Sequence, residues 1–122
     1  MAEAPSQAPS PLVLLVEDEP ILAINTQMML SAIGLEQVEV AGSLKEAWAL
    51  IDRHSFGLAI LDLSLGSETS LPIAERLCGD KVPVLITTGF EEVTLPPVCV
   101  GTPILRKPFR LEDLENSLAQ MR

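Results

Sequence analysis

Three runs of consecutive apolar residues constrain the fold of this chain more than any other feature. They occupy residues 12–16, 58–63 and 82–86, and almost every position within them is apolar. A strand with one face in water alternates between apolar and polar residues. An unbroken apolar run of strand length is instead typical of a parallel strand covered by helices on both faces. The three runs therefore predict the centre of a parallel sheet.

Two further segments predict the edges of the same sheet. Residues 37–40 alternate between polar and apolar side chains, as expected where one side of a strand faces water. Residues 102–106 contain Pro103, whose nitrogen cannot donate a hydrogen bond to a neighbouring strand. We expect these two strands at opposite edges.

Helical patterns fill the intervals between the strands. The first begins at Pro20, a favourable first-turn residue, and ends at Gly34. Its apolar stripe consists of Ile21, Leu22, Ile24, Met28, Met29 and Ile33. At the start of the second helix, Ser43 and Glu46 have the spacing of a capping box, in which each side chain accepts a hydrogen bond from a backbone amide.

Two more helices are predicted over residues 71–78 and 111–121, whereas only a turn or two fits at residues 91–95 before Pro96. Strands that alternate with helices through right-handed crossovers form a doubly wound sheet. The predicted fold class is therefore α/β, with a five-stranded parallel sheet of the flavodoxin-like order 2-1-3-4-5. Helices cover both faces, and the fourth helix is short or irregular.

Length and composition indicate one domain without a basic surface. The chain has 122 residues, of which 48% are hydrophobic, and a formal net charge of −9. We expect residues 1–11, rich in Ala, Pro and Ser, to be a disordered tail and residues 12–122 to form the domain. The acidic charge disfavours partners such as nucleic acid or an anionic membrane. No stretch resembles an export signal or a membrane span, so we expect a cytoplasmic location.

The two cysteines are predicted to be free thiols. Cys78 and Cys99 fit neither a Cys-x-x-Cys motif nor a zinc-site spacing, and two cysteines are too few for a disulfide scaffold. This interpretation assumes a reducing compartment.

Charged and hydroxyl side chains follow the predicted strands where each strand ends. In chain order these are Glu17 and Asp18, Asp62, Thr88, and Lys107. The carboxyl ends of parallel strands share one edge of the sheet, where ligands bind in folds of this type. Carboxylates beside an apolar sheet suit Mg²⁺, while lysine and threonine suit phosphoryl oxygens. The sequence therefore predicts phosphoryl transfer to or from Asp62 at a magnesium site.

The same residues carry a resemblance to a known family. The motifs LLVEDEP, AILDL, VLITTG and LRKPF occur in this order. Together they resemble the receiver domain of bacterial two-component response regulators, over residues 12–121. The resemblance implies that Asp62 accepts a phosphoryl group from a phosphohistidine donor in a Mg²⁺-dependent step. It also implies a signalling domain rather than an enzyme, one that catalyses only its own phosphotransfer and dephosphorylation.

The resemblance assigns roles residue by residue. The implied metal ligands are Asp18 and Asp62 directly, Glu17 through a bound water, and the backbone carbonyl of Ser64. The implied phosphoryl-binding and switch residues are Thr88, Lys107 and Phe90, and the Lys107–Pro108 peptide bond is expected to be cis.

One position departs from the common family pattern. Ile104 stands where most receivers have an aromatic switch residue, and Phe90 follows Thr88 and Gly89 instead. The segment ITTGF, together with the loop after Asp62, resembles the FAT GUY subgroup of single-domain receivers, which is associated with general stress signalling. Whether Phe90 replaces the missing aromatic stays open.

The resemblance predicts a stand-alone receiver, since no output domain follows Arg122. Its expected partners are a histidine kinase or a histidine phosphotransfer protein, and a downstream target protein. A first alternative is a degenerate receiver that binds its partner without phosphorylation, which the missing aromatic at Ile104 favours. A second is a small metal-dependent phosphohydrolase, but haloacid-dehalogenase phosphatases need a second aspartate two residues after the nucleophile, where Ser64 stands.

Overall fold

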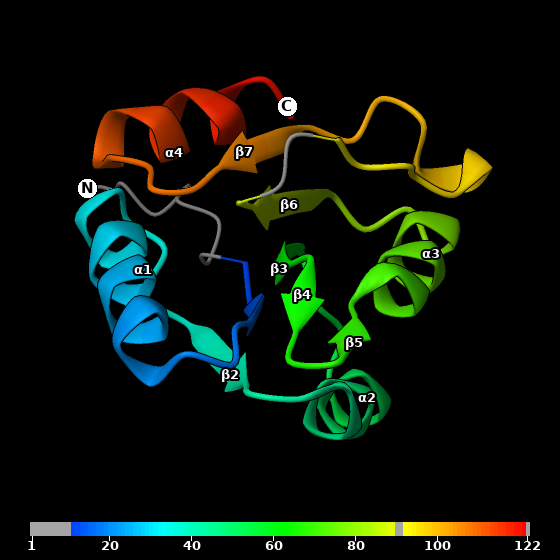
Figure 1. The fold of residues 1–122 in the computed structure, drawn as a ribbon. Helices are drawn as coiled ribbons and strands as arrows, with labels where there is room; N and C mark the ends of the chain where they lie inside the picture. Colours follow the sequence, from blue (N-terminus) through cyan, green and yellow to red (C-terminus); the bar gives the residue numbers. More distant parts are fainter. Residues whose placement is uncertain (1–10, 90–91, 122) are drawn as a thin grey trace, which may run out of the picture.

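The computed structural model describes residues 11–89 and 92–121. Its main sheet has five parallel strands in the order β2-β1-β3-β6-β7 (Figure 1). In chain order these strands are β1 (Val13–Val16), β2 (Val38–Ala41), β3 (Leu58–Asp62), β6 (Val84–Thr88) and β7 (Ile104–Arg106). The predicted strand order and both predicted edge strands are confirmed. Of the predicted tail, residues 1–10 lie outside the described residues.

Helices cover both faces of the sheet, as predicted (Figure 1). They are α1 (Pro20–Ala32), α2 (Leu44–Arg53), α3 (Leu71–Gly79) and α4 (Leu111–Ala119). Side chains of α1 and α4 pack with alternate residues of β1 and β3 into one core, and side chains of α2 and α3 form the other. Because the central strands are covered on both sides, every residue of β1 and β3 is buried. In this part of the chain no helix is long and apolar enough to cross a membrane.

Only part of the predicted apolar stripe of α1 faces the core, because Met29 and Ile33 are partly buried against it and the rest is not. The described side chains that α1 buries are Ala23, Thr26 and Leu30. By contrast, Ile21, Ile24 and Met28 are 73%, 55% and 65% exposed. The stripe is wide because α1 is apolar almost all round, so sequence periodicity alone cannot select the face that packs. One apolar face of α1 is consequently open to solvent.

Strand β6 begins two residues later than the apolar run predicts. The backbone amide of Val82 donates to the carbonyl of Leu77 at 2.9 Å, so Val82 belongs to the turn that ends α3. At its other end, β6 continues to Thr88, which pairs with Arg106 of β7. Thr87 and Thr88 are therefore the last two residues of the strand.

The loop after β3 contains a small hairpin that the sequence analysis missed. Strands β4 (Ser64–Leu65) and β5 (Glu68–Thr69) pair antiparallel around a turn in which Gly66 has φ +65°. The dipeptide Gly66–Ser67 is a recognisable two-residue turn signal. Leu65 is buried, so the hairpin anchors the loop that leaves the site.

The start of α2 follows the predicted cap, with a shifted partner. The Ser43 hydroxyl accepts a hydrogen bond from the Glu46 amide at 3.2 Å. The Glu46 carboxylate accepts from the amide of Gly42 at 2.7 Å, one residue before the expected partner. Both interactions satisfy amides that would otherwise lack partners at the helix start.

The prediction of free thiols is wrong. Cys78 at the end of α3 forms a disulfide with Cys99 in the short 3-10 helix η1 (Pro97–Cys99), and their Cα atoms are 5.5 Å apart. Spacing in the sequence gave no indication of this pairing, because 21 residues separate the two cysteines and only the fold brings them together. Within the described residues, η1 is the sole helical turn between β6 and β7, in agreement with the expected irregular connection.

Two substitutions within α1 test which of its faces is buried. Leu30→Ala, at a fully buried position, should lower the free energy of unfolding by about 2–5 kcal/mol because it leaves a cavity. Met28→Ala, at a position that is 65% exposed, should change it by less than about 0.5 kcal/mol. Urea denaturation followed by circular dichroism measures both, and equal losses would contradict the burial described here.

Candidate phosphoacceptor site

Four parallel strands bring the predicted site residues to one edge of the sheet. Glu17 directly follows β1, Asp62 ends β3, Thr88 ends β6 and Lys107 directly follows β7. The register pairs Asp62 with Thr87, and the amide of Lys107 donates to the carbonyl of Thr88 at 2.8 Å. Residues that are far apart in the sequence therefore meet because parallel strands end at a common edge.

Three carboxylates form a group that can hold a cation. One oxygen from each of Glu17, Asp18 and Asp62 lies within 4.8 Å of the other two. Glu17 and Asp62 are buried, while Asp18 faces solvent. Oxygen ligands with one solvent-facing member suit Mg²⁺, which keeps several water ligands. The donor set thus fits the ion that the sequence predicts.

Lys107 pairs with both buried carboxylates and offsets part of their negative charge. Its ammonium nitrogen lies 3.0 Å from Glu17 Oε1 and 3.2 Å from Asp62 Oδ2. The lysine side chain is 22% exposed, so its charge is largely shielded from water. Removing Lys107 is costly, because the two negative charges then stay buried without a counter-charge.

The pKa values of Glu17 and Lys107 are both raised. Burial raises the pKa of Glu17 above its ordinary 4.5, and the negative charge of Asp62 adds to this, while the hydrogen bond from Lys107 opposes it. Burial lowers the pKa of Lys107, but the hydrogen bond to Glu17 and the charges of Asp62 and Glu17 outweigh it, so the pKa rises above 10.5. Lys107 therefore carries its charge at neutral pH.

The remaining predicted site residues lie in β4, in β6 and after β7. Ser64 lies in β4, two residues past Asp62, and is half-buried. Thr88 is 2% exposed at the end of β6. The Lys107–Pro108 peptide bond is cis, as the resemblance implies. Phe90 lies outside the described residues, so its switch role stays a prediction.

A depression of about 370 Å³ lies between α1 and the chain after Lys107. Besides Glu17 and Lys107, it is lined by Met29 and Phe109 and by two side chains that the sequence analysis did not single out, Asn25 and Thr26. The one signal in the sequence was that Phe109 follows Lys107 and Pro108. Which α1 residues face the site depends on helix orientation, which periodicity left undecided.

The family model for the response regulator receiver domain matches residues 13–119. The chain belongs to this family. Receiver domains are signalling domains of two-component systems, and a group of acidic residues that typically binds Mg²⁺ is a family feature that Glu17, Asp18 and Asp62 reproduce here.

Individual relatives agree with this assignment. The chain is 35% identical to the transcriptional regulatory protein PmrA of Pectobacterium parmentieri over 108 residues, 84% of this chain and 48% of that protein. It therefore spans about half the length of this curated relative. The solution structure of SdrG from Sphingomonas melonis Fr1 is similar with a TM-score of 0.79 and 28% identity, covering 94% of this chain and 98% of that one. The PhyR stress response regulator is similar with a TM-score of 0.78 and 25% identity, covering 93% and 45%.

The raised pKa of Glu17 predicts a pH-dependent stability in the absence of metal. Between the ordinary pKa and the raised one, the folded chain holds more protons than the unfolded chain. Its free energy of unfolding therefore falls as the pH rises through this window. Glu17→Gln removes this loss, so its stability relative to the wild type should increase as the pH rises above the ordinary pKa of 4.5 and through the raised one.

Urea unfolding in the presence of a chelator measures this difference. The control is Glu19→Gln, which removes the same charge at an exposed neighbouring position. A stability difference for Glu17→Gln that stays constant across the pH range would contradict the prediction.

Proposed function

We propose that this chain is a single-domain receiver that accepts a phosphoryl group on Asp62 from a phosphohistidine donor. The observation that carries the proposal is the placement of the Lys107 ammonium 3.2 Å from Asp62 Oδ2 and 3.0 Å from Glu17 Oε1, beside the exposed carboxylate of Asp18. A nucleophilic carboxylate, a fixed cation and a set of metal ligands are the parts that phosphoryl transfer to an aspartate requires.

In the proposed step, an oxygen of Asp62 forms a bond to phosphorus while the bond from phosphorus to the donor histidine nitrogen breaks. The product is an acyl phosphate on Asp62, and the donor imidazole leaves with the bonding electron pair. Lys107 is a positioning and charge-neutralising cation for the transferred oxygens, and the Thr88 hydroxyl is a hydrogen-bond donor to them. Hydrolysis of the acyl phosphate returns the carboxylate.

Mg²⁺ would be held by Asp18 and Asp62 directly, by Glu17 through a water molecule, and by the backbone carbonyl of Ser64. When bound, the ion supplies positive charge against the phosphoryl oxygens. Lys107 lies beside these ligands and forms an ion pair with Asp62. The chain's own residues therefore orient Asp62 before the donor arrives.

The proposed partners are a histidine kinase or histidine phosphotransfer protein and a downstream target protein, in the cytoplasm. A role without an output domain of its own is supported by the match to SdrG, of which this chain covers 98%. The similarity to the PhyR stress response regulator supports a role in a stress-response phosphorelay and the likeness to the FAT GUY subgroup. Phe90 is proposed as the switch aromatic in place of Ile104.

Phosphorylation is tested by intact-protein mass after incubation with a small acyl phosphate. The wild type should gain one phosphoryl group in Mg²⁺ and none in chelator, and Asp62→Asn should gain none. Lys107→Ala should slow the gain by about a hundredfold because it removes the cation beside the phosphoryl oxygens.

Two exposed positions on α2 give matched controls, Asp52→Asn and Lys45→Ala, which should both behave as the wild type. No gain for the wild type, repeated with a phosphorylated histidine kinase as the donor, would leave the phosphorylation-independent binding module as the better hypothesis. Turnover of a generic phosphate ester that is lost in Asp62→Asn would favour the phosphohydrolase.

Docking of the donor is tested on the exposed face of α1. By resemblance, the contact surface comprises α1, β7 and α4. The apolar side chain of Leu22 is 39% exposed there and lines the depression beside Lys107 and Phe109. Leu22→Asp should slow transfer from a phosphohistidine protein by about tenfold or more, because a buried contact would receive a charge. Transfer from the small acyl phosphate should not change. Val100→Asp, at a position that is 86% exposed outside this surface, is the control, and an equal effect of both variants would contradict the docking site.

A further inference from the structure

The Cys78–Cys99 disulfide ties the connection between β6 and β7 to the end of α3. The backbone hydrogen bonds around η1 are local, because the amides of Cys99 and Val100 donate to the carbonyls of Pro96 and Pro97. These bonds shape the turn without fastening it to α3. The disulfide is therefore the covalent link that holds this segment against the helix.

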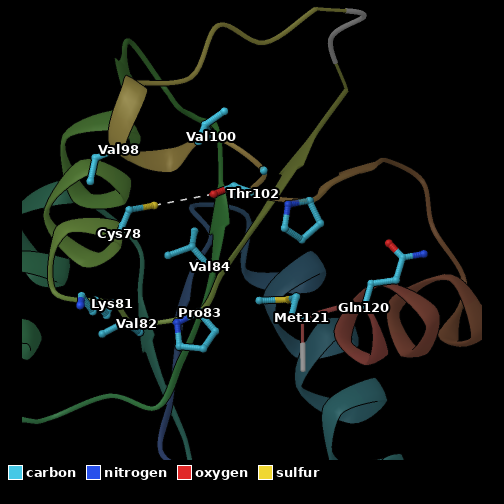
Figure 2. A pocket seen from close by; sticks show the side chains of 12 residues that line it. Cys78, Lys81, Val82, Pro83, Val84, Val98, Val100, Thr102, Gln120 and Met121 are labelled. Atoms are coloured by element: carbon cyan, nitrogen blue, oxygen red, sulfur yellow. Dashed lines mark hydrogen bonds between the residues drawn. The ribbon is translucent and has the colours of Figure 1, made fainter.

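The two sulfur atoms differ in their accessibility. Cys99 is 1% exposed and belongs to the core formed with α2 and α3. Cys78 is only partly buried and lines an open cavity of about 380 Å³, together with Val84, Val98 and Thr102 (Figure 2). A thiolate from solution can reach Cys78 through this cavity, whereas protein surrounds Cys99. Attack on the disulfide is consequently expected on the Cys78 side.

The surroundings also accommodate the reduced state. As a thiol, Cys99 has the carbonyl oxygen of Ala74 at 3.3 Å from its sulfur as a hydrogen-bond acceptor. The sulfur of Cys78 lies 3.7 Å from Thr102 Oγ1, a contact that Figure 2 marks with a dashed line. Each thiol therefore has a polar partner in place, and reduction leaves no orphaned polar group. On reduction the two sulfur atoms move apart from bonding distance to van der Waals contact, and these partners are already beside them.

We propose that Cys78 and Cys99 form a redox-controlled clamp on the β6–β7 connection, opened by a dithiol reductant at Cys78. A thiolate of the reductant attacks the Cys78 sulfur and forms a mixed disulfide, and Cys99 leaves as a thiolate that takes up a proton. The second thiolate of the reductant then attacks the mixed disulfide, so that Cys78 is released as a thiolate and protonated. Two electrons and two protons pass to the protein, and the reductant becomes a disulfide.

The clamp controls an apolar surface. Val98 and Val100, within and next to η1, are 48% and 86% exposed. In the oxidised state the disulfide holds both near α3. In the reduced state the covalent tie is replaced by packing of Cys99 and by the weaker contacts of Cys99 with the Ala74 carbonyl and of Cys78 with Thr102. In the cytoplasm, cystines are usually transient and redox-sensing rather than structural. This last argument rests on the location proposed above, but the test below does not.

Hydrogen exchange in the two redox states tests the clamp on the wild-type chain. Protein oxidised with diamide should show no alkylation of its cysteines. Dithiothreitol without denaturant should then give two alkylated cysteines while circular dichroism stays native. Backbone amides of residues 98–102 should exchange about tenfold faster in the reduced protein, with the amides of β1 and β3 unchanged. Reduction that occurs only in denaturant, or equal exchange in both states, would overturn the proposal.

Single variants test the direction of attack. In Cys99→Ser, oxidised glutathione should form a mixed disulfide with Cys78, whereas in Cys78→Ser it should leave Cys99 at least about tenfold less modified. Equal modification of both cysteines would overturn the assignment of Cys78 as the attacked sulfur. These measurements do not involve Asp62, so they can fail while the proposed phosphoryl transfer holds, and the reverse.

Discussion

The ion pairs of Lys107 with Glu17 and Asp62 are the interaction on which the rest of this site depends. Glu17 directly follows β1 and Asp62 ends β3, and every residue of both strands is buried, so two negative charges lie close together where little water reaches them. Such a pair is tolerated only with a cation between its members. Strand β7 supplies that cation from a position distant in the sequence, and the exposed Asp18 leaves one ligand open towards solvent.

Helix α1 buries mostly small side chains and leaves larger apolar ones on its surface. The small residue Ala23 and the hydroxyl of Thr26 pack inward with Leu30, so α1 lies close against the sheet. The larger Ile21 and Leu22 then face solvent. An apolar helix face next to a charged site is a surface that a partner helix can cover, which connects the packing of α1 to the proposed transfer from another protein.

Two kinds of chemistry flank the connection between β6 and β7. At one end of these strands Thr88 and Lys107 belong to the phosphoacceptor site. At the other end Cys78 and Cys99 form the disulfide, and Thr102 contacts Cys78. Among the described residues of this connection there is a single helical turn, whereas a longer helix would be held in place by its own packing. A covalent tie compensates for the small area that so short a turn can bury.

The sequence by itself determined the parallel sheet, its strand order, its edges and the grouping of Glu17, Asp18, Asp62 and Lys107. These follow from unbroken apolar runs, from Pro103 and from the rule that parallel strands end at one edge. Only the tertiary structure decided which face of α1 is buried, that Cys78 meets Cys99, and that Lys107 contacts both buried carboxylates. The physical reason is that periodicity and spacing are local properties of the chain. Helix rotation and contacts between distant residues are instead set by how whole elements pack against one another.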